Sequence, residues 1–338
     1  MDDSTGTPPM PLLHSQRQSH PLIGYYLSRK KLAKLRFDQF LLLCKRHHID
    51  TIELSSDYFE RTPVRVPQLI VHKLDDDHVS RRLTEQIRSL PVSSTVVLDR
   101  FDAIAKLLDR CEQYSLLNSN GKLFIVPPFV RIEQNASRST VEQALLAQQI
   151  AFPLVCKPIQ AHGEKSHDMK IIFDVEHLDD IDRPCVLQQF IDHNGILFKV
   201  FASKFTRLTK PKRATTLDLV GPTNYHIVQR NSIRNLHAYV DKATVSFHSS
   251  EVSSAQADHI LLSKDKSVAV TVDEKLIGTI ARSVQKLFEL NLVGVDVIVD
   301  RCTGDYAVID VNYFPGYEGV PDFSTELFHL CQQLLFQP

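Results

Sequence analysis

The sequence predicts an α/β protein in which a small parallel sheet precedes a larger region that mixes strands with helices. Three observations support this class. Short apolar segments alternate with helical patterns over the first hundred residues, the middle of the chain is rich in strands, and the last hundred residues combine one long amphipathic helix with a β-hairpin. With 338 residues, the chain is long enough for one to three domains.

The N-terminal region begins after a segment without periodicity. Residues 1–20 contain Pro8, Pro9 and Pro11 among Ser, Gln and His, which predicts a disordered leader. Beyond it, apolar runs alternate with helical spacing, the pattern of a small parallel α/β domain over 21–110. The expected strands are 22–27, 51–54, 69–71 and 95–98, the first expected helix carries Phe37, Phe40, Leu41 and Cys44, and a helix over 101–110 leads onward.

The larger region spans 111–335, with a central part at about 118–190 and a C-terminal part at about 191–335. We expect strands at 152–157, 169–173 and 185–188, a helix at 140–150 capped by Ser139 or Thr140, and a helix at 274–290 capped by Asp273. The basic segment at about 202–224 predicts a solvated surface loop; alternatively, its five cations help to gather polyanionic ligands.

A hairpin near the C-terminus is the most informative feature. Its arms, 293–299 and 306–313, alternate apolar and polar residues around a loop that contains Gly304. A turn centred near Thr303 places Asp296 opposite Asp310, and Asn312 shares a face with Asp310. Two carboxylates and an amide oxygen suit a hard cation such as Mg²⁺. The alternative is a hairpin whose polar residues simply face water.

Composition excludes several classes of protein. The chain carries 39 basic and 40 acidic residues, a net charge of −1 that gives no global signal for nucleic acid. Its six cysteines are dispersed without a CxxC pair, as in buried, reduced thiols rather than in a zinc site or a disulfide framework. No signal peptide or membrane span is found in the sequence. We therefore expect a soluble, cytoplasmic protein, and a monomer.

At the hairpin the sequence resembles a known family. Asp296 and the Asp310-Val311-Asn312 step running into Phe314-Pro315-Gly316 are similar to the metal-binding end of inositol-tetrakisphosphate 1-kinases. These are ATP-grasp enzymes that phosphorylate inositol polyphosphates, and the resemblance extends from about Leu22 to about Leu330. It implies an ATP-grasp fold, in which two α+β subdomains hold the nucleotide, and an inositol-phosphate-binding role for the N-terminal domain. No P-loop and no HRD or DFG motif of protein kinases is present.

The resemblance implies that ATP and two Mg²⁺ ions bind between the subdomains. Asp296, Asp310 and Asn312 would hold the metal, and the strand 188–190 would present its backbone to adenine. From the residues alone, Lys157 is equally explained as a lysine that reaches solvent, and Arg110 as a cation in the last turn of a helix. The implied ATP ligands are Arg110, Lys157, Gln188, Gln189, Phe190, Ile191, Lys199, Arg230, Ser232, Ser249 and Ser253.

The implied acceptor is an inositol polyphosphate, either inositol 3,4,5,6-tetrakisphosphate (1-position) or inositol 1,3,4-trisphosphate (5- or 6-position). Each phosphate brings more than one negative charge, so cations should dominate its recognition. His167, Lys199 and Asn312 are also the implied catalytic residues, acting by position and charge. The implied substrate ligands are Lys31, His72, Lys73, His167, Lys199, Asn312 and Gly316.

Two alternatives stay open at this point. Another ATP-grasp enzyme, a carboxylate–amine ligase, would use the same metal hairpin. The cation set Lys31, His72, Lys73 and His167 suits a polyanionic acceptor better than a small carboxylate. A non-catalytic inositol-phosphate-binding protein would need neither the metal ligands nor Lys157.

Overall fold

The computed structural model describes residues 20–60, 65–74, 77–91, 93–119, 123–206, 223–234, 236, 244–253, 261–262 and 271–336. The expected leader lies outside this range except for His20, and so does most of the basic segment. Its first residues, however, continue a strand that runs to Thr206, and Ser203 there is buried. A second strand begins at Thr223, so the expectation of a loop over about 202–224 was wrong for the described residues 202–206 and 223–224.

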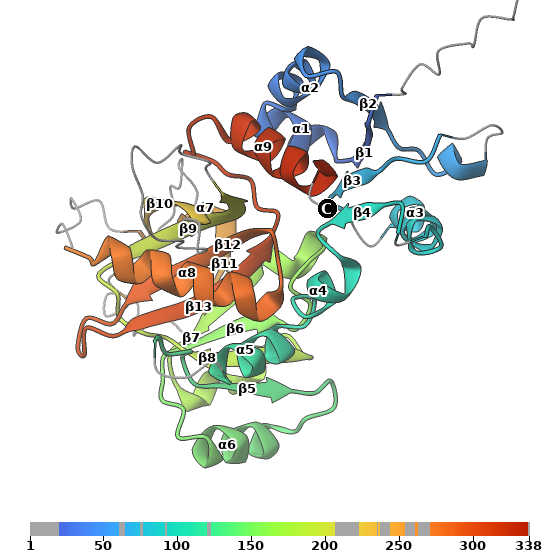
Figure 1. Ribbon diagram of the computed structural model, residues 1–338. Coiled ribbons are helices and arrows are strands. Elements are labelled where there is room, and N and C mark those ends of the chain that lie inside the picture. Colours follow the sequence, from blue (N-terminus) through green and yellow to red (C-terminus); the bar gives the residue numbers. More distant parts are fainter. Residues whose placement is uncertain are drawn as a thin grey trace, which may run out of the picture.

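Three sheets lie one above another in Figure 1, with the N-terminal sheet at the top and the five-stranded sheet at the bottom. The N-terminal sheet is parallel, in the order β2-β1-β3-β4. The central strand β3 is apolar and every one of its residues is buried, whereas the edge strand β2 is polar and only partly buried. The elements are β1 (Leu22–Tyr26), α1 (Arg29–Leu35), α2 (Phe37–Arg46), β2 (Asp50–Glu53), β3 (Leu69–His72), α3 (His78–Arg88) and β4 (Val96–Leu98).

The segment predicted as one helix over 101–110 is two helices. Helix α4 (Phe101–Ala105) ends early, and α5 (Arg110–Asn118) starts at Arg110. Asp109 is extended between them, and its carboxylate accepts hydrogen bonds from the backbone N–H groups of Cys111 and Glu112. Arg110 is therefore the first residue of a helix, so the interpretation of it as a last-turn cation was wrong.

The five-stranded sheet has the order β11-β7-β6-β8-β5 and is antiparallel throughout. Helix α6 is capped by Ser137, so the predicted caps Ser139 and Thr140 were wrong by one half-turn or more. Strand β11 adds to this sheet although it lies within the predicted C-terminal part of the sequence. The elements are β5 (Phe129–Ile132), α6 (Arg138–Ala147), β6 (Leu154–Pro158), β7 (Asp168–Ile172), β8 (Cys185–Gln189), β11 (Thr244–His248) and α7 (Ser249–Ser253).

The four-stranded sheet is antiparallel, in the order β10-β9-β12-β13. Helix α8 packs on one face, where Gly278 meets the ring of Tyr225, and α9 packs on the other, where Glu326 meets the neighbouring His226. Asp273 caps α8, as predicted. The elements are β9 (Ile196–Thr206), β10 (Thr223–Asn231), α8 (Glu274–Phe288), β12 (Leu292–Val299), β13 (Tyr306–Tyr313) and α9 (Phe323–Phe336).

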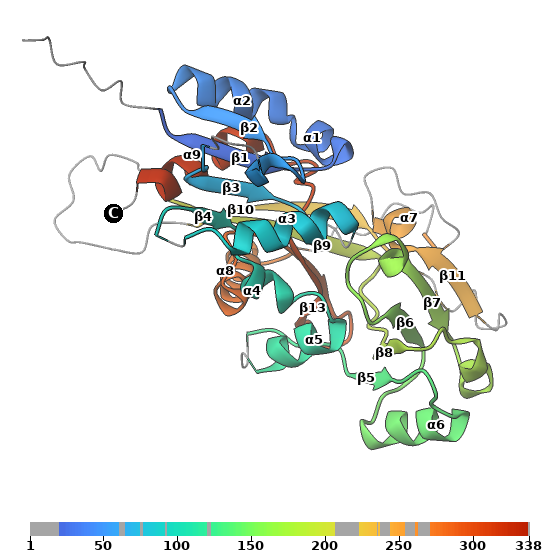
Figure 2. The same ribbon diagram turned by 90° about the vertical axis from the view of Figure 1, so that its right-hand side faces the viewer.

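The C-terminal helix joins the N-terminal domain to this sheet. Figures 1 and 2 both place α9 beside α1 and α2, at the opposite end of the sequence. Ser324 donates to the carbonyl oxygens of Leu35 and Arg36, and Phe328 lies against His47. A buried carboxylate, Asp99, adds a second link by accepting hydrogen bonds from Asn291 and Leu292. The N-terminal domain is thus fixed against the sheet that carries the hairpin.

Candidate functional site

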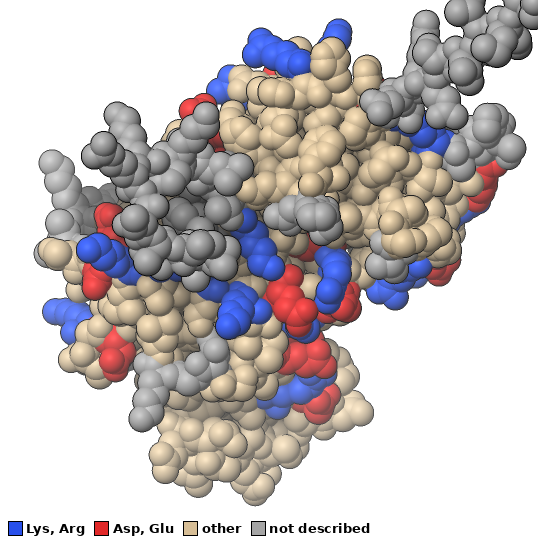
Figure 3. Space-filling model, in the orientation of Figure 1, with Lys and Arg blue, Asp and Glu red and all other residues tan. Residues whose placement is uncertain are grey.

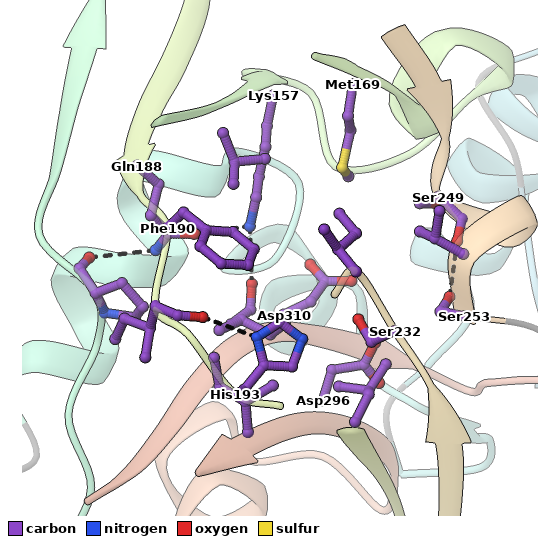
Figure 4. A pocket seen from close by; sticks show the side chains of 18 of the residues that line it. Lys157, Met169, Gln188, Phe190, His193, Ser232, Ser249, Ser253, Asp296 and Asp310 are labelled. Atoms are coloured by element: carbon purple, nitrogen blue, oxygen red, sulfur yellow. Dashed lines mark hydrogen bonds between the residues drawn. The ribbon is translucent and has the colours of Figure 1, made fainter. Parts of the chain in front are cut away.

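A cavity separates the five-stranded sheet from the four-stranded sheet, and we call it the nucleotide chamber (Figure 4). It contains about 920 Å³ of space, counting its open mouth. One wall is apolar, and a flat aromatic base fits such a slot. The apolar lining residues are Val155, Met169, Phe190, Ile191, Leu197, Ile233, Phe247, Val252, Ile298 and Ile309.

Two buried cations occupy the polar end of the nucleotide chamber. Lys157, at 6% exposed, donates from Nζ to the hydroxyl of Tyr114 (3.0 Å), to Oε1 of Gln188 (2.7 Å) and to the carbonyl of Ile309 (3.2 Å). Arg110 donates to Oδ1 of Asp310 at 2.8 Å and to two backbone carbonyls. Burial, with the nearby Arg110 charge, lowers the pKa of Lys157 to about 7. An anion entering the chamber would favour the charged ammonium.

The hairpin aligns charged side chains across three neighbouring strands. Asp296 of β12 pairs in register with Asp310 of β13 on one side and with Lys199 of β9 on the other. Nζ of Lys199 lies 3.6 Å from Oδ2 of Asp296, and the Asn312 amide donates to Oδ2 of Asp310 at 2.8 Å. The predicted pairing of the two aspartates and the shared face of Asp310 and Asn312 are therefore confirmed.

The hairpin is less regular than predicted. The register shifts by one residue next to Asp296, so Val297 pairs with Val308 and Ile309 has no residue opposite it on β12. Such a β-bulge bends the strand locally and redirects the side chains that follow it. Here, those side chains are the ones of Asp310 and Asn312.

The two aspartates differ in their charge environment. Burial, and then the charge of Asp310, raise the pKa of Asp296 against the opposing effect of Lys199. Burial acts in the same direction on Asp310, but Arg110 and Lys157 outweigh it and lower the pKa of this carboxyl. The positive charge near Asp296 is therefore too small to offset the cost of burying its carboxylate. This is expected for a carboxylate that binds a cation when the substrates are present.

The donor set fits Mg²⁺. Within the described ranges, no cluster of three or more His, Cys, Asp and Glu side chains is placed to hold a metal. The hairpin offers two carboxylates and an amide, all on one face. Mg²⁺ is typically bound by one or two carboxylates, and it completes its shell with water and substrate phosphates. The protein alone thus provides a partial shell, to which nucleotide phosphates would add.

A second cavity opens between the four-stranded sheet and the N-terminal domain, and we call it the basic chamber. Lysines from α1 and from the end of β3 line it, together with Arg230 of β10. Lys31 is 8% exposed, and burial together with Lys73 and Lys34 holds its pKa well below the ordinary value. The cations lining the chamber are Lys30, Lys31, Lys34, Lys73, Lys199 and Arg230.

Two of these lysines are bound to the backbone that follows the metal ligands. Nζ of Lys31 donates to the carbonyls of Phe314 and Pro315 and lies 4.3 Å from the centre of the Phe314 ring. Nζ of Lys73 donates to the carbonyl of Tyr313 at 2.7 Å. Ser28 holds the first turn of α1 in place by accepting from the backbone N–H of Lys31. The N-terminal domain therefore contacts the hairpin directly.

The two chambers meet at the hairpin. Six residues line both of them. They are the three residues predicted to be catalytic, which are His167, Lys199 and Asn312, together with Asp296, Ser249 and Ser253. The ring nitrogen Nδ1 of His167 lies 3.0 Å from Oγ of Ser249. Burial, and then the neighbouring His248, lower the pKa of His167, which favours the neutral ring. A group passing from one chamber to the other would cross this junction.

Most of the predicted ligands lie where the prediction needs them. The nucleotide chamber is lined by Arg110, Lys157, Gln188, Gln189, Phe190, Ile191, Lys199, Ser232, Ser249 and Ser253. The basic chamber is lined by Lys31, Lys73, His167, Lys199, Asn312 and Gly316.

Two expectations are corrected, and a third is narrowed. His72 is 1% exposed, its Nε2 lies 3.0 Å from the carbonyl of Asp99, and burial lowers its pKa to about 4, so it is a neutral residue packed within the N-terminal domain. Arg230 lines the basic chamber and donates to the carbonyl of Glu318, so it does not reach the nucleotide chamber. The N–H groups of Gln189 and Phe190 already donate to the carbonyls of Pro128 and Pro153, so the predicted backbone contact to adenine would have to use other groups of this segment.

Sequence reasoning missed several lining residues. The apolar lining residues, such as Met169, Ile233 and Ile298, cannot be told from ordinary core residues in the sequence. Periodicity does not separate side chains that face a core from side chains that face a ligand. Lys30 and Lys34 could have been found, since they lie four residues apart on one helix next to Lys31. No local signal identifies His248 or Glu318.

Comparison with known proteins agrees with this geometry. The family model described as the inositol 1,3,4-trisphosphate 5/6-kinase ATP-grasp domain matches residues 118–214 and 216–333. The model described as the pre-ATP-grasp domain of the same kinases matches residues 22–104. Together these two matches cover most of the chain.

Individual relatives point the same way. Inositol-tetrakisphosphate 1-kinase from Danio rerio is 37% identical over 333 residues, covering 93% of this chain and 78% of that protein. The protein of the same name from Xenopus laevis is 34% identical, covering 94% of this chain and 79% of that protein. Both alignments include the N-terminal domain as well as the hairpin.

Solved structures establish the fold. D-cycloserine synthetase DcsG superimposes with a TM-score of 0.59 at 12% identity, covering 93% of this chain and 99% of the synthetase. D-alanine–D-alanine ligase from Bacillus anthracis complexed with ATP gives a TM-score of 0.52 at 14% identity, covering 94% of this chain and 97% of the ligase. At these identities the likeness shows the ATP-grasp fold alone. As for membranes, none of the helices in the described part of the chain has the length and apolar character needed to span a bilayer.

Proposed function

The chain belongs to the inositol 1,3,4-trisphosphate 5/6-kinase family, and on that premise we propose that it transfers phosphate between the two chambers described above. It is an ATP-dependent inositol polyphosphate kinase. ATP provides the γ-phosphate, and a ring hydroxyl accepts it. The acceptors are the 1-position of inositol 3,4,5,6-tetrakisphosphate and the 5- or 6-position of inositol 1,3,4-trisphosphate.

The observation that supports this function best is the position of the proposed metal ligands Asp296, Asp310 and Asn312. They lie between the apolar lining of the nucleotide chamber and the cations of the basic chamber. Adenine occupies the apolar slot, and the phosphates extend past Lys157 and Arg110 toward Asp296 and Asp310. The inositol phosphate lies against the lysines of the basic chamber. Phosphoryl transfer depends mainly on in-line placement and on neutralisation of charge, and this arrangement supplies both.

Individual residues have distinct tasks in this proposal. Asp296, Asp310 and Asn312 would hold two Mg²⁺ ions, which would neutralise negative charge on the ATP phosphates. Lys199, at the junction, places its ammonium where both substrates reach it. Neutral His167 donates a ring N–H to a phosphate oxygen.

Lys31 and Lys73 require one further step. Their ammonium groups are bonded to the backbone carbonyls at residues 313–315. A bound inositol phosphate would compete with these carbonyls for the ammonium protons. Its negative charges would also raise the lowered pKa of Lys31 toward the charged form.

We also propose a monomer in a reducing compartment such as the cytoplasm. Of the six cysteines, five are buried and none is paired in a disulfide. The N-terminal domain, to about residue 110, acts as the inositol-phosphate-binding domain. The remainder, to about residue 335, acts as the ATP-grasp domain.

The test is phosphate transfer by the purified protein with Mg²⁺ and γ-labelled ATP. Inositol 1,3,4-trisphosphate and inositol 3,4,5,6-tetrakisphosphate are offered in parallel with unphosphorylated inositol and with D-alanine plus a second amino acid. We expect labelled product from the two polyphosphates only. Phosphate release that depends on amino acids would instead support a ligase, and tight inositol phosphate binding without transfer would support a binding protein.

A further inference from the structure

Strand β13, which carries Asp310 and Asn312, is the last strand of its sheet. β12 pairs with one of its edges; at the other edge Ile125 forms an isolated bridge to Ala307, and beyond that bridge the described residues place no strand beside Ile309, Asp310 and Val311. An open edge of this kind is a row of backbone groups that must find other partners or face water. A strand that holds metal ligands needs a fixed backbone, so the groups that cover this edge are informative.

Helix α5 covers this edge with side chains instead of a strand. Nε2 of Gln113 donates to the carbonyl of Val311 at 3.0 Å, and the N–H of Val311 donates to Oε1 of Gln113 at 3.3 Å. The Gln113 amide thus acts like one peptide group of a missing strand. Val311 is the residue between the two metal ligands Asp310 and Asn312.

Two other side chains of α5 bind the residues of β13 that precede Val311. Arg110, Gln113 and Tyr114 lie at positions i, i+3 and i+4, on one face of α5. The hydroxyl of Tyr114 donates to the carbonyl of Ile309 at 3.0 Å, at the bulge, and Arg110 donates to the Asp310 carboxylate. Gln113 and Tyr114 are completely buried. Three consecutive residues of β13, from Ile309 to Val311, are therefore held by a single helix.

We propose that Gln113, supported by Tyr114, is a positioning residue for the metal site. It holds the backbone of Val311 so that Asp310 and Asn312 project from the same face with a fixed separation. The bulge at Ile309 makes this support necessary, because it interrupts the regular pairing with β12 immediately before Asp310. Outer partners of metal ligands commonly change metal affinity when they are lost.

The inference rests on the proposed kinase function for the identity of the metal, but its test does not require turnover. Mn²⁺ replaces Mg²⁺ as the probe, in the presence of a non-hydrolysable ATP analogue. Free Mn²⁺ is measured by electron paramagnetic resonance, which gives the dissociation constant directly. Normal Mn²⁺ binding by a protein that transfers no phosphate would therefore count against the proposed function and not against this inference.

The variant is Gln113→Met, which keeps the length of the side chain and removes both hydrogen bonds. We expect Mn²⁺ to bind about tenfold more weakly, and the amide of Val311 to exchange its hydrogen faster. The matched control is Gln285→Met in α8, where another buried glutamine donates to a backbone carbonyl, that of Asn291, at 3.0 Å. The control should lose comparable thermal stability and keep its Mn²⁺ affinity.

Tyr114→Phe provides a second variant, in case Gln113→Met does not fold. It removes one hydroxyl and its hydrogen bonds to Ile309 and Lys157, and we expect a smaller, roughly threefold, loss of Mn²⁺ affinity. Unchanged Mn²⁺ affinity in the folded variants would overturn the proposal. So would an equal loss in Gln113→Met and Gln285→Met, because a general loss of stability would then explain both.

Discussion

The two chambers are built in different ways. The nucleotide chamber lies between two sheets of the ATP-grasp region, and its cations are already bonded to side chains and carbonyls within that region. The basic chamber combines helix α1 and strand β3 of the N-terminal domain with the backbone after Asn312. Under the proposed function, Lys31 and Lys73 would exchange their carbonyl partners for phosphates. The first site is therefore preformed, and the second depends on how two domains meet.

The charges on the surface are balanced, unlike those inside the basic chamber. Lysine, arginine, aspartate and glutamate side chains are intermixed over the middle of the face in Figure 3. Ion pairs of the structure include Lys106 with Glu289 and Arg131 with Asp109, all at least partly exposed. Such exposed pairs contribute little to stability. The unbalanced positive charge lies inside the basic chamber, which is where a polyanion would be selected.

Removing a proposed metal carboxylate, beside the junction of the two chambers, should have the largest effect. We expect Asp310→Asn to lower kcat by at least about 10²-fold, because the carboxylate both holds the cation and pairs with buried Arg110. Steady-state kinetics at saturating ATP measures this change. Asp300→Asn, in the exposed hairpin loop, is the control and should retain activity. A kcat for Asp310→Asn near that of the wild type would separate the hairpin from catalysis.

The next largest effect should separate the chambers. Lys31→Met should raise the KM for the inositol phosphate by roughly 10- to 100-fold, the range for losing a hydrogen bond between charged groups. The KM for ATP should change little, because Lys31 lines only the basic chamber. Lys45→Met, at an exposed position of α2, is the matched control. An equal rise in both KM values would show that the two chambers are not independent.

The complementary variant affects the nucleotide chamber. Phe190→Ala should raise the KM for ATP by about tenfold through loss of apolar contact with the base, and leave the KM for the inositol phosphate unchanged. Phe336→Ala, at a residue that is 60% exposed, is the control. If the KM for ATP does not change, the adenine does not lie in the apolar slot.

The smallest expected effect concerns pH. Because burial lowers the pKa of Lys157 to about 7, its amine is largely neutral at pH 8 in the free protein. ATP favours the ammonium, so binding at pH 8 should take up a proton, and affinity should fall by less than about tenfold between pH 7 and pH 8. Calorimetry in two buffers of different ionisation enthalpy measures the proton uptake. Lys157→Met should abolish it, and an identical uptake in that variant would assign the proton elsewhere.

The sequence predicted the hairpin well because its signals are local. Alternation with a period of two residues and a loop containing glycine determine which residues of the two arms face each other, so Asp296 opposite Asp310 follows from counting. The bulge at Ile309 does not follow: counting from Thr303 places Val299 opposite Ala307, whereas the structure pairs Val299 with Tyr306, and the extra residue Ile309 brings Asp296 opposite Asp310. The break before α5 had a signal, Asp109 as an N-cap, but the apolar spacing through 101–110 concealed it.

Residues placed by tertiary packing were the least predictable. A histidine at the end of a parallel strand, such as His72, can face a ligand or pack inside its own domain, and only tertiary packing decides between them. The pairing of Gln113 with Val311 joins residues 198 positions apart, which no local pattern encodes. The resemblance to a kinase family supplied the roles of Lys157, Lys199 and Asn312, which residue patterns alone left open.

One measurement tests most directly the claim that two unlike chambers meet at the metal hairpin. It is a crystal structure with Mn²⁺, a non-hydrolysable ATP analogue and inositol 3,4,5,6-tetrakisphosphate, in which anomalous scattering locates the metal. The account predicts manganese bound by Asp296, Asp310 and Asn312, with adenine in the apolar slot and the inositol phosphate against Lys31. Manganese bound by other side chains, or an inositol phosphate outside the basic chamber, would contradict it.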